Sequence, residues 1–360
     1  MATITASKRH YHLLDGLRGV AALMVIIYHL FECFPADTWI IGHGYLAVDF
    51  FFILSGETVP EHKRLNVWSF FKRRLIRLHP MVVLGIALGV LTFFIQGGTR
   101  WDGTHVTISA VMIAVLLHLF FIPEIPGASS DIRGNGEMFP LNGPHWSLFF
   151  EYIGNIFYAL LLRRLPTKLL TLWVVILGIA FAVLGVSDLA GYGNIGMGWT
   201  LEGVNFWGGL LRMMFPFSCG LLMSRVFKPM KIRGAFWICT ILLVIFLSIP
   251  NLGKMNCIYE VTCVIVVFPL IVYMAASGTT TDRASTSLCR FLGDISYPLY
   301  AVHYPFMYLF YYYIGFPETW RTPGETWMLM VALAVGNVLL AYAALKLYDE
   351  PLRKLLSKRK

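Results

Sequence analysis

Apolar runs about 20 residues long recur along the whole of this chain, and they constrain its fold more than any other feature. Apolar residues make up 57% of the 360 residues, and charged residues only 14%. A helix of about 20 residues crosses the ~30 Å hydrocarbon layer of a membrane. Backbone polar groups in that layer have no water to bond, so the spans must be helical. We therefore predict an all-α, polytopic transmembrane helix bundle.

Ten of these runs are predicted to cross the membrane. They cover residues 13–34, 44–58, 78–96, 145–162, 169–186, 205–224, 234–250, 257–276, 295–315 and 326–347. A further apolar run at about 107–122 is shorter and is followed by prolines, so we expect a re-entrant or peripheral segment there. It belongs to a long loop, 97–144, that is rich in Gly and Pro. The whole chain, 1–360, is expected to be a single integral membrane domain.

The distribution of basic residues sets the expected orientation. If 107–122 does not span, most of the 29 Lys and Arg residues lie in loops on one side, and the positive-inside rule assigns that side to the cytoplasm. Both termini are then cytoplasmic, including a basic tail at 348–360, and the loop 97–144 is on the outer side of a bacterial inner membrane. The net charge of +9 belongs to these loops, so we expect membrane lipid and no nucleic acid as a partner.

The six cysteines lie mostly in or beside apolar runs, and none forms a C-x-x-C pair. This pattern is typical of packing residues, and it predicts neither a redox motif nor a metal site. The sequence also lacks an H-E-x-x-H motif, a Walker loop, a dinucleotide fingerprint and a G-x-S-x-G elbow. Any chemistry is therefore expected from polar residues inside the spans or at their ends.

The first span carries two such residues, Arg18 and His29. They are 11 residues apart, which places them within about 20° of one helix face and about 16 Å apart along the axis. Ionisable residues within a membrane are costly and are usually functional. A single membrane histidine is often a packing residue, but with Arg18 in register a chemical role for His29 is favoured.

A second cluster lies at the cytoplasmic end of the third span, in the sequence FFKRRLIRLHP. Arg73, Arg74 and Arg77 are spaced by one helical turn or less. Such a cluster is commonly a solvated membrane anchor. Three guanidinium groups one turn apart also form a good phosphate clamp, because the planar fork matches phosphate oxygens.

Two further polar clusters occur later in the chain. Trp146, Ser147 and Glu151 open the fourth span, and a carboxylate one turn into a span is hard to explain by packing. Tyr300 and His303 lie three residues apart in the ninth span. A polar pair between helices and a functional pair are equally compatible with that spacing.

In this order, the clusters resemble the acyltransferase-3 family of integral membrane O-acyltransferases, which includes O-antigen, exopolysaccharide and macrolide acylating enzymes. The matching motifs run along nearly the whole chain: Arg18 and His29 in R-x10-H; Asp49, Ser55 and Gly56 in the second span; Arg74, Arg77 and Pro80 in the basic segment; Trp146, Ser147 and Glu151 in W-S-L-x-x-E; Ser296, Tyr297, Tyr300 and His303; and Glu350 with Pro351.

The resemblance implies a membrane O-acyltransferase that moves an acyl group, with acetyl favoured, from cytoplasmic acyl-coenzyme A to a hydroxyl group. It implies no bound cofactor, since acyl-coenzyme A is a co-substrate. The implied donor-binding residues are Arg18, Arg73, Arg74 and Arg77, and the implied acceptor-side residues are Trp146, Ser147 and Tyr300. His29 is expected to be the general base, and Glu151 or Asp49 is expected to orient either His29 or the acceptor. His303 is the alternative base, and an acyl-histidine intermediate remains an alternative.

Three departures from the family pattern limit what can be transferred. Glu57 replaces an apolar or aromatic residue, the fourth span runs EYIGNIFY where E-E-x-F-Y is commoner, and no SGNH-hydrolase domain follows. The expected acceptor is a hydroxyl of a cell-envelope glycan, a lipid-linked sugar or a secreted small molecule. The competing hypothesis is a permease that exports a glycan or acylated lipid without chemistry, and the absence of an internal repeat weighs against it.

Overall fold

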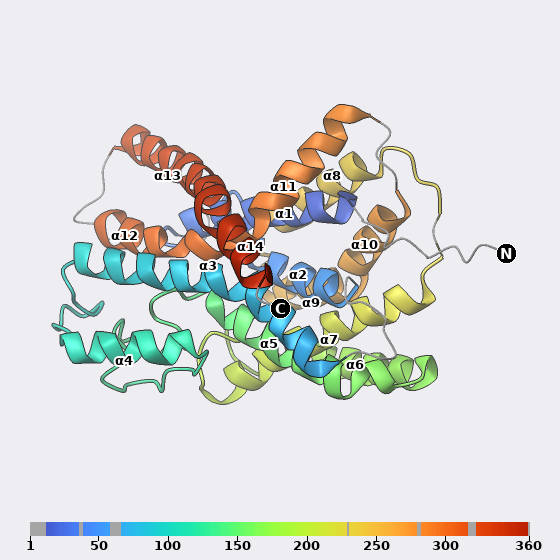
Figure 1. The fold of residues 1–360 in the computed structure, drawn as a ribbon, viewed down its shortest axis with the longest axis horizontal. Coiled ribbons are helices and arrows are strands. Elements are labelled where there is room, and N and C mark those ends of the chain that lie inside the picture. The colour runs from blue at the N-terminus through green and yellow to red at the C-terminus, as the bar shows by residue number, and fades with distance from the viewer. Residues whose placement is uncertain are drawn as a thin grey trace.

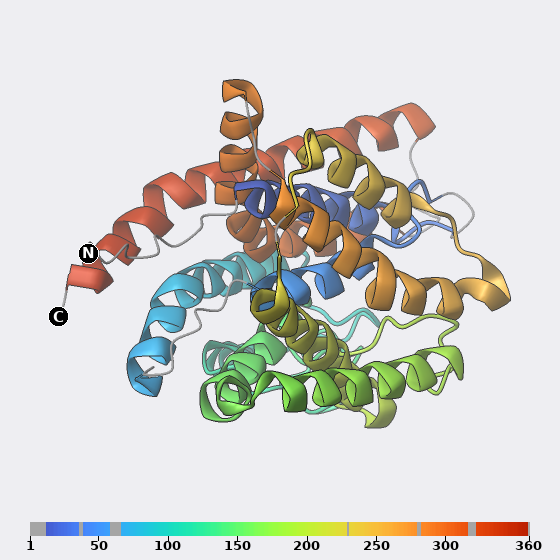
Figure 2. The same cartoon turned by 90° about the vertical axis from the view of Figure 1, so that its right-hand side faces the viewer.

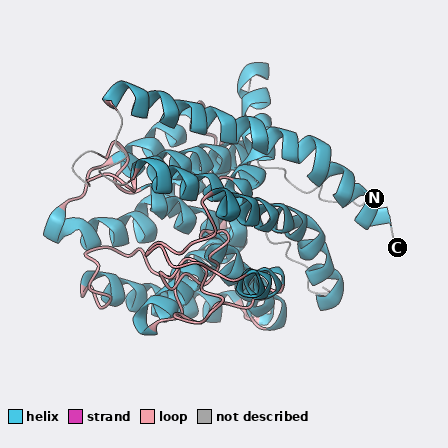
Figure 3. Cartoon of the chain, turned by 90° about the vertical axis from the view of Figure 1, so that its left-hand side faces the viewer, coloured by secondary structure: helices cyan, strands magenta, loops and turns pink. Residues whose placement is uncertain are grey.

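The structure is a computed structural model that describes residues 12–35, 39–57, 66–228, 230–278, 282–315 and 322–358. Within these ranges the regular secondary structure is helical and no β-strand is present (Figure 3). This confirms the all-α class predicted from the apolar runs. The start of the chain and the last two residues of the predicted basic tail lie outside the described ranges.

The helices follow one another along the chain without an intervening domain. They are α1 (His12–Phe31), η2 (Gly44–Leu46), α2 (Ala47–Glu57), α3 (Val67–Ile95), α4 (Ile108–Leu119), α5 (His145–Leu160), η3 (Leu162–Arg164), α6 (Thr167–Val186), α7 (Gly203–Val226), α8 (Ala235–Ser248), η4 (Gly253–Met255), α9 (Asn256–Thr262), η5 (Cys263–Val267), α10 (Phe268–Ser277), α11 (Arg283–Val302), α12 (Tyr304–Ile314), α13 (Pro323–Ala344), η7 (Leu345–Asp349) and α14 (Glu350–Lys358).

Six helical segments among the described residues are long and apolar enough to cross a membrane: His12–Phe31, Val67–Ile95, Thr167–Val186, Gly203–Val226, Gly253–Ser277 and Pro323–Ser357. The chain is thus a multi-pass membrane protein. The remaining predicted spans correspond to the shorter helices α2, α5 and α8 and to the pair α11 and α12. Figure 2 shows α13 and α14 running as one long rod along the edge of the bundle.

The ninth predicted span, 295–315, is not one continuous helix, because the structure divides it into α11 and α12 at His303. Pro305 has no N–H to donate to the carbonyl of Ala301, four residues earlier, which favours a break at this point. The side chain of Asn142 donates to that carbonyl instead, at 2.8 Å. The break therefore places His303 at a junction between two helices rather than on a regular helical face.

Close helix contacts fix the centre of the bundle (Figure 1). The most extensive packing joins α1 to α11 and α2 to α7. A Cβ atom at Gly56 would lie 1.9 Å from the carbonyl oxygen of Phe217, and one at Gly220 would lie 2.0 Å from that of Ile53. Small residues allow two membrane helices to approach this closely. The contact sets the register of α2 against α7, and with it the polar residues that the two helices carry.

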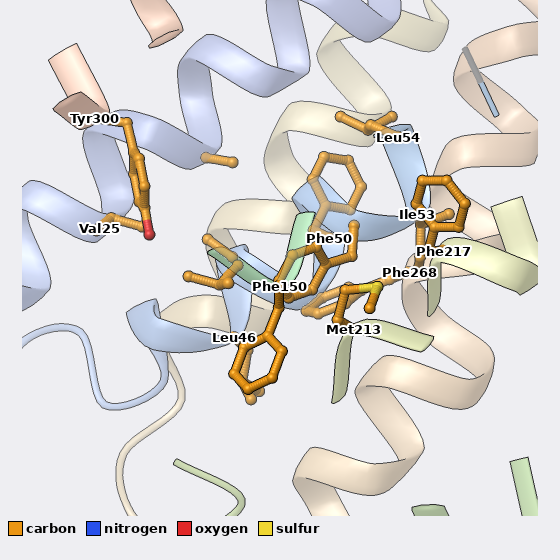
Figure 4. Packing of buried hydrophobic residues seen from close by; sticks show 14 of the residues in the cluster. Val25, Leu46, Phe50, Ile53, Leu54, Phe150, Met213, Phe217, Phe268 and Tyr300 are labelled. Carbon is orange, nitrogen blue, oxygen red and sulfur yellow. The ribbon is translucent and has the colours of Figure 1, made fainter. Parts of the chain in front are cut away.

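Aromatic side chains surround α2 below this contact. Phe50, Phe150, Phe217 and Phe268 are all buried, and the rings of Phe50 and Phe268 lie 5.7 Å apart (Figure 4). Packed cores resist small displacements, since nearly every atom has close neighbours. The glycine contact with α7 and this aromatic packing together fix the position of α2.

The loop at 97–144 is folded onto the bundle rather than extended. Arg133 lies fully buried at its centre, with its guanidinium 3.9 Å from the centre of the Tyr308 ring. The same group donates to the carbonyl of Pro140 at 3.2 Å and to the side chain of Gln96. Helix α4 packs beside α3 and has only 12 residues, fewer than a span needs. That 107–122 does not cross the membrane stays a prediction.

Candidate active site

His29, in the last turn of α1, is held by a carboxylate that lies three residues further along the chain. The Nδ1 atom of His29 is 2.7 Å from Oε2 of Glu32. The hydroxyl of Tyr311 lies 2.9 Å from the same carboxylate and 2.8 Å from the carbonyl oxygen of His29, and its one proton can be donated to either acceptor. With Nδ1–H donated to Glu32, the Nε2 lone pair is the site that can accept a proton. This arrangement suits a general base.

His303 packs behind His29 and is fixed by backbone atoms. The two imidazole rings are stacked with centroids 5.5 Å apart. Nδ1 of His303 lies 2.9 Å from the carbonyl oxygen of Tyr300 and 3.1 Å from that of Leu299, so it carries the proton that these bonds require. His303 does not line the cavity described next, and its position favours support of His29 rather than direct contact with a substrate.

His29 opens into a cavity of about 920 Å³, which we call the His29 cavity. Aromatic side chains make up much of its lining: Tyr28, Trp39, Tyr45, Trp101, Trp146, Tyr192, Trp199, Tyr300, Tyr304, Tyr308 and Tyr311. Aromatic faces offer apolar contact area, and Tyr and Trp add a polar tip. The cavity is thus large enough for a second substrate of considerable size and can contact both its apolar and its polar groups.

A second, much smaller space of about 80 Å³ lies among basic residues, and we call it the arginine pocket. Arg18, Arg74 and Arg77 line it together with Glu151. Arg18 also pairs with Asp15 at 2.8 Å. The structure thus brings together three of the four predicted donor-binding residues. The fourth, Arg73, is exposed and does not line the pocket.

The Trp146–Glu151 motif is divided between the two spaces, whereas the sequence predicted that all of it faced the acceptor. Trp146 lines the His29 cavity, but Ser147 and Glu151 line the arginine pocket. Glu151 accepts a hydrogen bond from the hydroxyl of Ser55 at 2.6 Å. The first turns of α5 therefore reach from one space to the other.

Asp49 does not orient His29, contrary to one of the expectations from the sequence. It forms a buried ion pair with Arg212 of α7, with Nη2 and Oδ2 2.6 Å apart. Arg212 also donates to the carbonyl of Met197 at 2.7 Å and stacks on Trp146 at 5.3 Å. Arg212 lines the His29 cavity. Asp49 thus compensates a cation at the cavity wall, and the carboxylate that contacts His29 is that of Glu32.

The 97–144 loop contributes a carboxyl to the His29 cavity. Glu137 accepts hydrogen bonds from the hydroxyl of Tyr308 and, at 2.9 Å, from the side-chain amide of Asn135. Burial raises the pKa of Glu137 above the usual carboxyl value, although these hydrogen bonds act in the opposite direction. The loop is therefore part of the site rather than a cover added to it.

Three of these residues were missed as site residues in the sequence, and they differ in how visible they were. Glu32 lies three residues after His29 in a helical run, so spacing alone could have identified it. Arg212 is a charge within a predicted span, which is itself a functional signal. Glu137 lies in a loop without periodicity, and nothing local in the sequence distinguishes it from other loop carboxylates.

The bundle holds a basic pocket and, in the adjacent cavity, a histidine–carboxylate pair. Such an arrangement is suited to joining two substrates within a membrane. Comparison with known families agrees, because residues 11–346 match the acyltransferase domain of the acyltransferase-3 family. The chain belongs to this family of acyltransferases.

Individual relatives support the same assignment. The chain is 36% identical to "Protein 2 in picA locus" of Rhizobium radiobacter over 160 residues, which are 41% of this chain and 80% of that protein. It is 23% identical over 377 residues to a Staphylococcus aureus (strain COL) protein named "Putative O-acetyltransferase", covering 95% of this chain. It is 39% identical over 95 residues, 24% of this chain and 15% of the relative, to the O-acetyltransferase OatA of S. aureus (strain NCTC 8325).

The chain spans only part of some relatives. The strain COL match covers 57% of that protein's length. No solved structure matches the chain significantly.

Proposed function

We propose that this chain transfers an acyl group, specifically acetyl, from acyl-coenzyme A to a hydroxyl group of a second substrate. The observation that carries the proposal is that the His29–Glu32 pair lines one space and the arginines line a second space, and the two spaces share part of their lining. The names of the S. aureus relatives, which describe O-acetyltransferases, support the choice of an acetyl group and a hydroxyl acceptor.

The arginine pocket is the proposed donor site. Guanidinium groups bind phosphate oxygens with paired, charge-assisted hydrogen bonds, and coenzyme A carries several phosphates. The pocket itself is too small for the nucleotide, so Arg18, Arg74 and Arg77 would hold phosphate or the pantetheine arm at its mouth. We place this side at the cytoplasm of a bacterial inner membrane, since coenzyme A is a cytoplasmic metabolite and the basic loops favour that orientation.

His29 is the proposed general base on the acceptor hydroxyl. Its Nε2 takes the hydroxyl proton as the oxygen attacks the thioester carbonyl, and the protonated ring then returns the proton to the leaving thiolate. One C–O bond forms and one C–S bond breaks. The Glu32 carboxylate stabilises the charged imidazole between these steps. General-base assistance contributes about 10²–10⁴-fold to a rate.

The proposed acceptor is a hydroxyl of a cell-envelope glycan, a lipid-linked sugar or a secreted small molecule. The size of the His29 cavity and its aromatic lining support an extended polar substrate that also has apolar faces.

The test uses purified protein and acetyl-coenzyme A. Release of the coenzyme A thiol is followed with a thiol reagent, in the presence of membrane extract that supplies acceptors. His29→Ala should lower the rate at least about 10²-fold. His105→Ala is the matched control, because His105 is exposed and lies outside both spaces. Wild-type turnover in the His29 variant would refute the proposed mechanism.

A labelling experiment with the same purified protein distinguishes the covalent alternative. If an acyl-histidine forms, protein incubated with labelled acetyl-coenzyme A and no acceptor retains label on His29 after denaturation. Direct attack by the hydroxyl leaves the denatured protein unlabelled.

A further inference from the structure

The two spaces of the site have a common wall. Of the residues that line the arginine pocket, two also line the His29 cavity, and these are Val48 and Tyr300. Val48 comes from α2 and Tyr300 from α11. We call these two side chains the partition. Both are buried, and the spaces on either side of them are separate in this structure.

Tyr300 is held in the partition both by its hydroxyl and by the packing of its buried ring. The hydroxyl oxygen lies 2.7 Å from the hydroxyl of Ser147 and donates to the carbonyl of Pro144 at 3.1 Å. Its ring meets the ring of Phe51 edge-on, with centroids 5.7 Å apart. In Figure 4 the ring stands beside Val25 of α1, apart from the central group of phenylalanines. Because Tyr300 is buried in the core, its movement requires neighbouring side chains to shift and its hydroxyl contacts to break.

The proposed reaction cannot take place while the two spaces remain separate. The thioester would enter beside Arg18 and Arg74, whereas the base that activates the hydroxyl is His29, on the other side. The carbonyl carbon must come within about 3–3.5 Å of the attacking oxygen. The His29 cavity is large and polar enough to hold water, which would compete with the hydroxyl for the thioester.

We propose that Tyr300 and Val48 form a gate between donor and acceptor sites: it admits the acyl end of the donor to His29 and otherwise keeps cavity water away from the thioester. This inference rests on the proposed function, because it names how the same site brings its substrates together. It predicts that damage to the gate converts a transferase into a thioester hydrolase. In that side reaction water replaces the acceptor hydroxyl, the C–S bond breaks, and acetate and the coenzyme A thiol are released.

The decisive experiment measures hydrolysis of acetyl-coenzyme A by the purified protein without acceptor. Tyr300→Ala should raise this hydrolysis about tenfold or more above the wild-type level and lower transfer to acceptor. Tyr300→Phe keeps the ring but removes the hydroxyl contacts to Ser147 and Pro144, so its hydrolysis should lie between that of the wild type and that of Tyr300→Ala. Tyr273→Ala is the matched control, since Tyr273 donates to a carbonyl at an exposed position and lines neither space. The double variant His29→Ala/Tyr300→Ala should lose the added hydrolysis, because the water is activated at His29.

Val48 gives an independent test that leaves the tyrosine in place. Val48→Ala should raise acceptor-free hydrolysis, and Val48→Phe should lower transfer. If neither Tyr300→Ala nor Val48→Ala raises hydrolysis in protein that still binds coenzyme A, the gate is refuted. A wild-type protein that cleaves no thioester, with or without acceptor, would instead refute the proposed function itself.

Discussion

The arginine pocket makes a prediction that separates specific donor binding from a general basic surface. Arg73, Arg74 and Arg77 are close in sequence, but Arg74 and Arg77 line the pocket and Arg73 does not. We expect Arg74→Ala and Arg77→Ala to weaken the binding of coenzyme A, and Arg73→Ala to leave it within about twofold of the wild type. Arg73 and Arg77 are both exposed, so the difference expected between them rests on position: Arg77 lines the pocket, whereas a charge outside it is screened over about 8 Å at roughly 0.15 M salt.

The size of the effect follows from the burial of Arg74, which is only 9% exposed. A hydrogen bond that involves a charged group contributes about 1.5–3 kcal/mol. Each 1.4 kcal/mol corresponds to a factor of about ten in affinity, so Arg74→Ala should weaken binding roughly 10- to 150-fold. Arg74→Lys should weaken the binding of coenzyme A less than Arg74→Ala does, because an ammonium keeps the charge but not the paired donors.

Equilibrium binding of coenzyme A to the purified variants, together with KM for acetyl-coenzyme A, measures both quantities. A melting curve for each variant confirms that the protein remains folded. Equal losses for Arg73→Ala and Arg74→Ala would show that the basic segment acts only as a membrane anchor. Unchanged binding in both Arg74→Ala and Arg77→Ala would refute the assignment of the pocket.

Three further predictions concern the carboxylates of the site. Glu32→Gln should lower kcat about 10- to 10²-fold with little change in KM for the donor, since the lost charge acts on the protonated imidazole; steady-state kinetics with unchanged kcat would contradict this. Asp49→Asn should destabilise the protein by about 3–5 kcal/mol, because Arg212 is left as an uncompensated buried charge, and Asp49→Asn/Arg212→Met should recover part of that loss in thermal unfolding. The pKa of Glu137 is raised in the folded state, so the folded protein binds this proton more readily than the unfolded chain does. Stability should therefore fall as the pH rises from about 4.3 through the raised pKa. Glu137→Gln should reduce this pH dependence of Tm, and an identical dependence in the variant would argue against the prediction.

The class of the fold could be predicted because it depends on local composition. Apolar runs require membrane helices, and the ends of most predicted spans agree with the structure to within a few residues. The third span was expected to begin at residue 78, but α3 begins at Val67, since the basic segment continues the helix beyond the apolar run. Apolar length alone does not define where a helix ends when charged residues at the interface also favour helix.

The break at His303 shows what local patterns cannot supply. Pro305 indicated that a backbone hydrogen bond would be missing, but the group that replaces it, Asn142, lies 159 residues away in the sequence. The pairing of Asp49 with Arg212 depends likewise on two helices 163 residues apart. Long-range partners of this kind are set by tertiary packing, which one sequence does not reveal.

The candidate site could be predicted as a set of residues but not as a geometry. The sequence identified Arg18, His29, Glu151 and Tyr300, and the structure divides them between two spaces. Only the structure shows that Tyr300 belongs to both. The roles of these residues in catalysis stay predictions until the variants are measured.

The central claim is that an acyl group passes from the arginine pocket to a hydroxyl beside His29, and a sided transfer assay tests it most directly. Sealed membrane vesicles of each orientation, from cells that produce the protein, receive labelled acetyl-coenzyme A from the outside only. The account predicts ester-linked label in vesicles that expose the arginine pocket to the medium, and no label in the opposite orientation or with His29→Ala. Equal labelling in both orientations, or undiminished labelling in the His29 variant, would contradict it.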